Sequence, residues 1–309
     1  MSGIGIITNP HSKLNRRNPD RPALLGFILG AQGQLEVTNS LADLERVALD
    51  FKGKGITTLA INGGDGTVSR TLTAFLAAYG ETPLPQIALL RGGTINVLAN
   101  NLGIRGSPEE ILYRLVEWHS SGRAMPVRRV PTLCVEGNHG FLFANGMAPA
   151  FLKEYYKRKS GAFGAFLLVC AVWLSSLYKG RLHDKIVQDL RQNLRPGGRR
   201  PIDHTSCSVF CSTVLKLPLG VPLFHMLDSH PREFQCVSFT TPSRESWRLP
   251  LVLLRRQDDL GKDKISFCCE ELRIEMPHPF DYTLDGELFT STNNSVNIGI
   301  GPELDFVTI

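Results

Sequence analysis

The sequence lacks the patterns by which small proteins bind structural metals or build disulfide frameworks. It contains no CxxC pair, its eight histidines show no HxxxH spacing, and its seven cysteines are an odd number that includes the adjacent Cys268 and Cys269. Adjacent cysteines are poor disulfide partners, so we expect reduced thiols, as in cytosolic proteins. The histidines are expected to be structural or solvated, because they lack the spacing of metal ligands.

A large excess of one charge is also missing, and so is a secretory leader. The 34 basic and 29 acidic residues leave a net charge of +5, which suits a phosphorylated ligand or an anionic membrane surface. This excess is too small for a typical nucleic-acid-binding protein, so no nucleic acid partner is expected. Residues 1–8 are too short for a leader and continue directly into a strand pattern, which favours the cytoplasm.

The first 125 residues or so alternate between strand-like and helix-like segments. Strands are expected at 3–8, 34–38, 57–61 and 86–90, and helices at 23–29, 41–52 and 67–79. Such alternation predicts βαβ units and a mainly parallel sheet. Ligands of such sheets bind beyond the carboxyl ends of the strands.

From about residue 126 onward the pattern changes to short β-like runs with Gly/Pro turns, which predict an antiparallel β domain. The runs lie at 132–136, 141–144, 207–217, 234–240, 249–254, 264–269, 272–276 and 295–300. The basic stretch at 191–201, which contains Gly and Pro, is expected to be an exposed loop. An exposed sheet edge in this domain would allow a homodimer.

One uncharged segment stands out in this second part. Residues 160–178 contain no charged side chain and have basic residues on both sides. The length is close to that of a membrane span, but three serines, two glycines and the surrounding soluble-looking domain favour a buried or membrane-facing helix. A helix at a surface where lipid enters would have the same composition and the same basic flanks.

Two glycine-rich turns follow predicted strands in the first part. "GGDGT" at 63–67 precedes the helix at 67–79, and "RGGTIN" at 91–96 follows the strand at 86–90. Glycines let backbone N–H groups approach an anion, and a helix N-terminus attracts phosphate. The pair therefore predicts a nucleotide site. Asp65 could cap the helix, help organise magnesium or orient its neighbours, and a tight turn with an Asp cap is the alternative reading.

Two further turns carry polar groups that phosphoryl transfer could use. "NPHS" at 9–12 follows the first strand as a rigid polar turn. "DGE" at 285–287 presents two carboxylates, of which Asp285 could accept a hydroxyl proton and Glu287 could help hold magnesium. Taken alone, the DGE segment is better interpreted as a hairpin turn.

Together, "NPHS", "GGDGT", "GTINVLANNLG" at 93–103 and "DGE" resemble, in order and spacing, the diacylglycerol kinase catalytic-domain family. This family includes bacterial lipid kinases, sphingosine kinases and ceramide kinases, and the resemblance covers nearly the whole chain. It implies an α/β N-terminal domain like that of NAD kinases, formed by residues 1–125 and completed by 298–309. A C-terminal antiparallel β-sandwich, residues 126–297, would be the lipid-substrate domain, with ATP in the cleft between the two.

The resemblance also implies functions for single residues. Asp285 would be the general base on the lipid hydroxyl, Asp65 would belong to the catalytic set, and Glu287 would assist ATP and contact Mg²⁺. The nucleotide-binding residues would be Thr8, Asn9, Gly63, Gly64, Asp65, Gly66, Thr67, Thr94 and Glu287. The implied protein is a lipid kinase that uses ATP and Mg²⁺ on a diacylglycerol, sphingosine or ceramide type of lipid. It would be cytoplasmic and peripheral at the inner membrane face.

Two other functions stay open at this stage. An NAD-kinase-like enzyme with a soluble substrate would share the GGDGT segment. A lipid- or nucleotide-binding regulator with little turnover would fit the departures from the family pattern. Arg128 or Arg129 stands where many relatives have an acidic residue, and Asp228 alone is left of a metal-binding turn.

Overall fold

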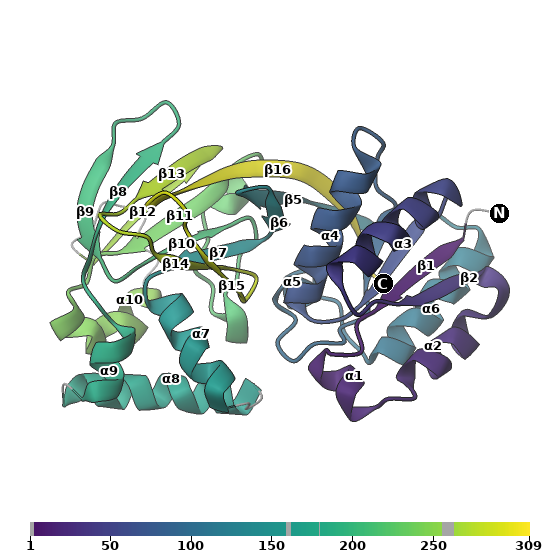
Figure 1. The fold of residues 1–309 in the computed structure, drawn as a ribbon, viewed down its shortest axis with the longest axis horizontal. Helices are drawn as coiled ribbons and strands as arrows, with labels where there is room; N and C mark the ends of the chain where they lie inside the picture. The colour runs from purple at the N-terminus through teal and green to yellow at the C-terminus, as the bar shows by residue number, and fades with distance from the viewer. Residues whose placement is uncertain (1–2, 159–161, 179, 255–262) are drawn as a thin grey trace. The chain divides into compact units, whose positions relative to one another are not determined.

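The computed structural model describes residues 3–158, 162–178, 180–254 and 263–309 (Figure 1). The chain forms two compact units, one of Met1–Thr132 with Pro302–Ile309 and the other of Leu133–Gly301. Strands β5, Val127–Val135, and β16, Ser295–Val307, each continue through a boundary between the units.

The first unit is built on a parallel sheet with strand order β2-β1-β3-β4. The strands are β1 Ile4–Thr8, β2 Gly33–Val37, β3 Thr58–Asn62 and β4 Gln86–Leu89. The end of β16 joins this sheet in parallel, with Phe306 opposite Ile87. Every residue of β1 and β3 is buried, as is typical of parallel strands covered on both faces.

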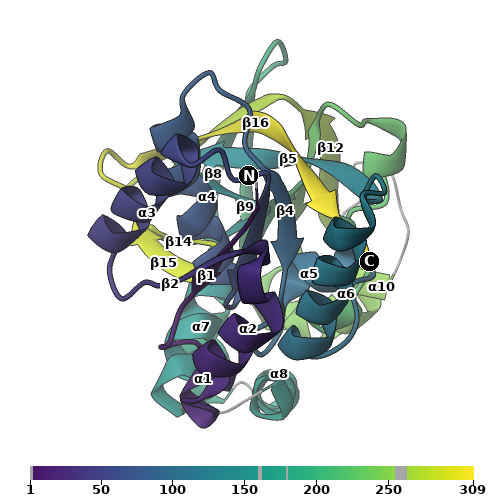
Figure 2. The ribbon, with the colours of Figure 1, turned by 90° about the vertical axis from the view of Figure 1, so that its right-hand side faces the viewer.

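Helices cover both faces of this sheet. They are α1 Lys13–Arg17, α2 Arg21–Leu29, α3 Leu41–Gly53, α4 Asp65–Tyr79, α5 Val97–Asn101 and α6 Pro108–Ser121. The helices α3 and α4 pack together on one face, and α2 and α6 on the other (Figures 1 and 2). Capping boxes start α3 at Ser40 and α6 at Ser107, since each serine accepts an N–H three residues later.

The second unit contains two antiparallel sheets. In one, β13 pairs with β8 and with the first part of β16, and β8 also pairs with β9; the other has the order β12-β11-β10-β7-β14-β15. The strands are β6 Asn138–Gly140, β7 Leu142–Asn145, β8 Leu190–Pro196, β9 Ile202–Ser206, β10 Ser208–Ser212, β11 Phe234–Phe239, β12 Lys264–Cys269, β13 Glu271–Glu275, β14 Asp281–Leu284 and β15 Glu287–Thr290. One apolar core takes side chains from both sheets, for example Leu194, Ile274, Phe143 and Phe234. The expected fold class, an α/β domain followed by an antiparallel β-sandwich, is confirmed.

Two local expectations in this unit were wrong. Residues 249–254, expected as a strand, form helix α10, Leu249–Leu254, after the short 3₁₀ helix η4, Ser243–Arg248. A short apolar run cannot be assigned by periodicity alone, and Pro250 suits the first turn of a helix. The stretch at 191–201, expected as a loop, begins as β8, whose residues Gln192, Leu194 and Pro196 are buried between exposed arginines. Because polar Gln192 occupies one of the buried positions, the sequence does not show the alternation of apolar and polar residues that predicts a strand.

Helices α7 Met147–Arg158, α8 Ala162–Leu177, α9 Arg181–Ile186 and α10 lie on one side of the second sheet of this unit (Figure 1). A second apolar core lies between them and strands β10 and β11, and contains Phe224, Phe239 and Ile186. The expected helix at 160–178 is thus present as α8. Within the described ranges, no helix combines the length and the hydropathy that crossing a membrane requires.

Candidate functional site

Three turns of the first unit meet where β1, β3 and β4 end. Asn9, after β1, donates its side-chain N–H to the hydroxyl of Thr67 at 2.8 Å, and its backbone N–H to the carbonyl of Asn62 at 3.1 Å. Ser12 donates its hydroxyl to the carbonyl of Gly92 at 3.1 Å. The NPHS turn is therefore bonded to both glycine turns, as expected for parallel strands whose carboxyl ends share one edge.

The two glycine turns touch backbone to backbone. A Cβ on Gly63 would overlap the side chain of Thr67, and a Cβ on Gly92 would overlap that of Asn62. A Cβ on Gly93 would overlap the Cα of Gly64. Glycine is needed at these positions because of close approach, since none of them has a positive φ.

The second glycine turn is held by Asn96, the N-cap residue of α5. Asn96 lies in the left-handed region, with φ of 52°, which asparagine tolerates better than most residues. Its side chain accepts the N–H of Gly93 at 3.2 Å and donates to the carbonyl of Gly93 at 3.0 Å. The amide side chain thereby fixes the turn that Thr94 belongs to, and Thr94 itself is half-buried.

Asp65 starts α4, but its carboxylate is directed to the next helix. The carboxylate accepts the N–H of Leu98 at 3.4 Å, and the N–H groups of Val97 and Asn96 also bond to it. Burial raises the pKa of the Asp65 carboxyl above its usual value, while these N–H groups oppose that shift. Asp65 therefore links the GGDGT turn to the start of α5.

The edge formed by these turns has the groups that bind an anion. The N–H groups of Gly66 and Thr67 lie in the first turn of α4, where no helix carbonyl can accept them. Helix α4 has 15 residues, so its dipole adds positive potential at this end. Nearby, the buried oxygens Thr8 Oγ1 and Asn62 Oδ1 have no hydrogen-bond partner among the described residues. Such unpaired polar groups fit a site that a polar ligand completes.

In the second unit, Asp285 and Gly286 form the tight turn between β14 and β15. Both have positive φ, 49° and 86°, the conformation that Asp-Gly favours in two-residue hairpins. The carboxylate of Asp285 accepts N–H groups of Phe141 at 3.1 Å and Leu142 at 3.0 Å. The hairpin reading of the DGE segment is thus correct, and the turn also fixes the direction of the carboxylate.

Residues without a sequence signal support this hairpin. Gly140 leaves room for the carboxylate, because a Cβ there would stand 2.7 Å from an oxygen of Asp285. Tyr156, on α7, donates its hydroxyl to the carbonyl of Gly286 at 2.6 Å, and Lys153 on the same helix forms an ion pair with Asp281. Sequence reasoning missed these supports, because the partners lie more than a hundred residues apart.

The expected site residues divide between the units. Thr8, Asn9, Thr94 and the 63–67 turn lie together in the first, whereas Asp285 and Glu287 lie in the second. The described part of the chain contains no group of three or more His, Cys, Asp or Glu side chains arranged to hold a metal ion. Arg129, one of the departures from the family pattern, forms a salt bridge with Asp305 at 3.1 Å.

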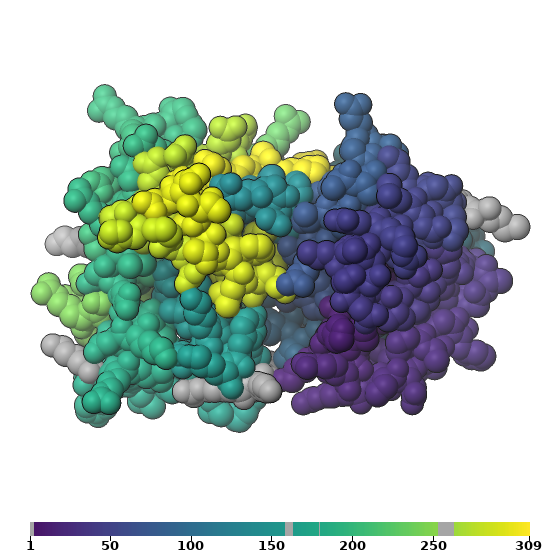
Figure 3. Space-filling model, viewed as in Figure 1, coloured from purple at the N-terminus to yellow at the C-terminus, as the bar shows by residue number. Residues whose placement is uncertain are grey.

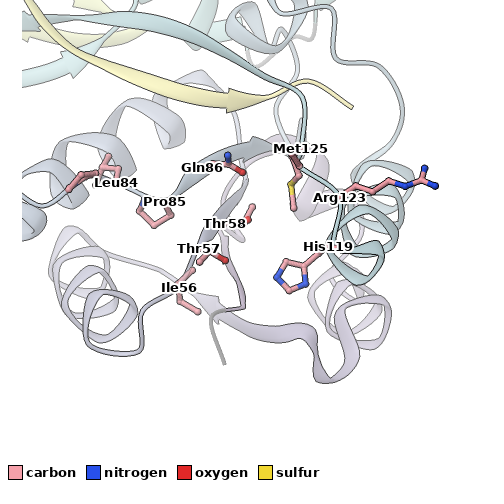
Figure 4. A pocket seen from close by; sticks show the side chains of 12 residues that line it. Ile56, Thr57, Thr58, Leu84, Pro85, Gln86, His119, Arg123 and Met125 are labelled. Carbon is pink, nitrogen blue, oxygen red and sulfur yellow. The ribbon is translucent and has the colours of Figure 1, made fainter.

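A hollow of about 590 Å³ lies at the opposite edge of the first sheet, where β3 and β4 begin (Figure 4). Its lining includes Thr57, Gln86, His119 and Met125, and the guanidinium of Arg123 points away from it (Figure 4). None of the expected site residues lines this hollow.

Comparison with known proteins shows one domain match and a similar fold in solved structures. Residues 4–125 match the diacylglycerol kinase catalytic domain. A solved structure of a diacylglycerol kinase from Bacillus anthracis str. Sterne is 13% identical, with a TM-score of 0.69, over 100% of this chain and 97% of that one. A second structure from the same organism, of a protein provisionally assigned as a diacylglycerol kinase, is 14% identical, with a TM-score of 0.71 and the same coverage. At identities this low, the likeness in the TM-scores shows a shared fold alone.

No curated protein matches the chain. The family assignment of this chain therefore rests on the domain match, which includes the strands β1 to β4 and both glycine turns. Residues 4–125 of this chain belong to the diacylglycerol kinase catalytic-domain family.

Proposed function

We propose that the protein is an ATP-dependent lipid kinase that transfers the γ-phosphoryl group of ATP to a lipid hydroxyl. The observation that carries the proposal is the meeting of three turns at one sheet edge, with Asn9 bonded to Thr67 and Gly64 in contact with Gly93. Backbone N–H groups at glycine-rich turns and helix N-termini commonly bind phosphate, because no side chain blocks their approach. The domain match makes a kinase the natural context for such a site.

The chain offers fitting groups for both ATP and Mg²⁺. The N–H groups of Gly66 and Thr67 would bind phosphate oxygens, and the half-buried Thr94 would add a hydroxyl at the same edge, where the hydroxyl of Thr8 is buried without a partner among the described residues. Mg²⁺ usually keeps several waters and takes only one or two carboxylates together with phosphates, and Glu287 would be the carboxylate contact. Bound ATP supplies the transferred phosphoryl group, and bound Mg²⁺ neutralises charge on the phosphates.

On the acceptor side, Asp285 would take the proton of the lipid hydroxyl while that oxygen bonds to phosphorus and ADP leaves. The N–H groups of Phe141 and Leu142 keep the carboxylate in one orientation, so it would need little rearrangement to act. Asp65 would serve as a positioning residue, because its carboxylate is bonded to the start of α5.

The test is an assay of the full chain with γ-labelled ATP and Mg²⁺ on diacylglycerol, sphingosine and ceramide in mixed micelles, with NAD as a soluble acceptor. We expect label in at least one lipid and none in NADP. Label in NADP alone would instead make the protein an NAD kinase. ATP binding without any labelled product would support a regulator, and the absence of both would overturn the proposal.

A further inference from the structure

Helix α8 is apolar on the side that faces solvent as well as on the side that faces the protein. Its inner residues Ala165 and Leu168 are buried, and Val172 packs against the second core of the unit. Its exposed residues are Phe163, Phe166, Leu167, Val169, Trp173, Leu174 and Leu177. A surface helix of a soluble protein normally has a polar outer face, so an outer face of this kind indicates an apolar partner.

The neighbouring residues of η4 and α10 extend this apolar surface. Trp173 donates its indole N–H to the carbonyl of Trp247 at 3.0 Å, which ties α8 to η4. Trp247 is 44% exposed, and Leu251 on α10 is 55% exposed. We call the exposed side of α8 together with Trp247 and Leu251 the α8 face. Helix α8 itself lies along the lower margin of the second unit in Figures 1 and 3.

The sequence around α8 holds the excess positive charge of the chain. Residues 153–185 contain seven of the 34 lysines and arginines and two of the 29 acidic residues, so the rest of the chain has 27 of each. The whole net charge of +5 thus comes from this stretch, which brackets α8 at both ends. Exposed Trp and Phe side chains flanked by basic residues suit the boundary between anionic headgroups and acyl chains.

We propose that the α8 face docks on an anionic phospholipid bilayer. The buried inner side of the helix keeps α8 on the protein, so only its outer side enters the lipid. A second copy of the chain is disfavoured as the occupant, because two such faces would bring their surplus positive charges together.

Docking of the α8 face would also position the turn that contains Asp285. This inference rests on the proposed function. Helix α7 directly precedes α8 in the chain, and Tyr156 on α7 is bonded to Gly286 in the Asp285 turn. Lys153 on α7 forms an ion pair with Asp281 in the same hairpin. The bilayer would therefore hold the turn at a set position relative to the lipid whose hydroxyl reacts.

The test measures vesicle binding without nucleotide, so it is independent of kinase activity. The full chain is sedimented with vesicles of phosphatidylglycerol and phosphatidylcholine, and with vesicles of phosphatidylcholine alone. We expect binding to the first that is at least tenfold stronger and that weakens in 0.5 M NaCl. Equal binding to both vesicles, or no binding to either, would overturn the proposal.

Single substitutions test whether vesicle binding occurs through the α8 face. Leu174→Glu and Phe166→Glu change half-exposed side chains, so the fold should survive, which a thermal melt checks. Each is expected to weaken vesicle binding at least tenfold, and Arg181→Glu roughly fivefold or more. The matched control Phe27→Glu changes an 84% exposed phenylalanine of α2 in the first unit and should bind like the unchanged protein. Equal loss in the control would contradict the assignment.

Two further readouts separate the alternatives. If the protein is a dimer in solution and Leu174→Glu makes it a monomer, the α8 face is a self-interface and the proposal fails. If a lipid kinase activity exists, the ratio of the rate on vesicle-borne to that on dispersed short-chain diacylglycerol should fall at least tenfold in Leu174→Glu. An unchanged ratio would contradict the role in positioning the acceptor, while the vesicle-binding result would still stand.

Discussion

Gly64 and Gly93 are in contact through their backbones. A Cβ on Gly64 would stand 3.3 Å from the Cα of Gly93, and a Cβ on Gly93 would overlap the Cα of Gly64. These residues belong to turns that follow neighbouring strands, β3 and β4. The contact brings the start of α4 and the start of α5 to the same place, and the proposed phosphate site depends on it.

Gly93→Ala is expected to separate the two turns, because backbone atoms of Gly64 cannot move aside as a flexible side chain could. We expect ATP affinity to fall roughly 10- to 100-fold, as for displacements of about 1 Å in positioned sites. Calorimetric titration with ATP measures this. The control Gly26→Ala has open space around it in α2, so it should leave affinity unchanged and stabilise the fold by about 0.5–1 kcal/mol. Unchanged affinity in Gly93→Ala would contradict the role of the contact.

Asp65→Ala should destabilise the start of α5, because the N–H groups of Val97 and Leu98 lose a buried acceptor. The expected loss is about 1–3 kcal/mol of unfolding free energy, measured by urea denaturation. Asp65→Asn keeps one acceptor oxygen and should lose less. Amide hydrogen exchange at Val97 and Leu98 gives a local readout, and equal exchange rates in all three proteins would rule out this role for Asp65.

Asp285→Asn should separate catalysis from folding. The Asn oxygen can still accept the N–H groups of Phe141 and Leu142, so the hairpin should keep its conformation. Loss of the base is expected to lower the phosphorylation rate roughly 10²- to 10⁴-fold, with ATP affinity unchanged. Asp203→Asn removes an exposed carboxylate of the same unit and serves as the control. An active Asp285→Asn protein would mean that another group takes the proton.

The ion pairs of Glu154 should stabilise the second unit at neutral pH and lose this effect in acid. Ion pairs with Lys185 and Lys157 lower the pKa of Glu154 from 4.5 to about 2. Because the folded pKa is depressed, the stabilisation is present above pH 4.5 and is lost as the pH falls toward 2. The free energy of unfolding of the unchanged protein should exceed that of Glu154→Gln at pH 7, and this difference should shrink between about pH 4.5 and 3. A constant difference would show that the ion pairs do not stabilise the fold.

Much of the first unit could be predicted from the sequence, because its signals are local. The four strands at 3–8, 34–38, 57–61 and 86–90 appear within one or two residues of the expected bounds. Helix α6 was not among the expected elements, although Ser107 and Glu110 form a capping box at its start. A closer reading of capping residues could have found it.

The second unit was harder to predict, because distant pairing decides its elements. Gln192 is buried in β8 and donates to Ser206 at 2.8 Å, a partner that makes a polar residue acceptable there. The run at 249–254 is apolar throughout, which cannot distinguish a strand from a helix. Its helical state depends on packing against the second core.

The sequence by itself determined where the chain turns after its strands, which turns must be free of side chains, and which helix has no charge. These properties follow from residue types and short-range spacing. Only the tertiary structure decided that Asp65 reaches the start of α5, that Asn9 joins Thr67, and that α8 exposes one apolar side while burying the other. The physical reason is that burial and hydrogen-bond partners are set by segments distant in sequence, which become neighbours only when the chain folds.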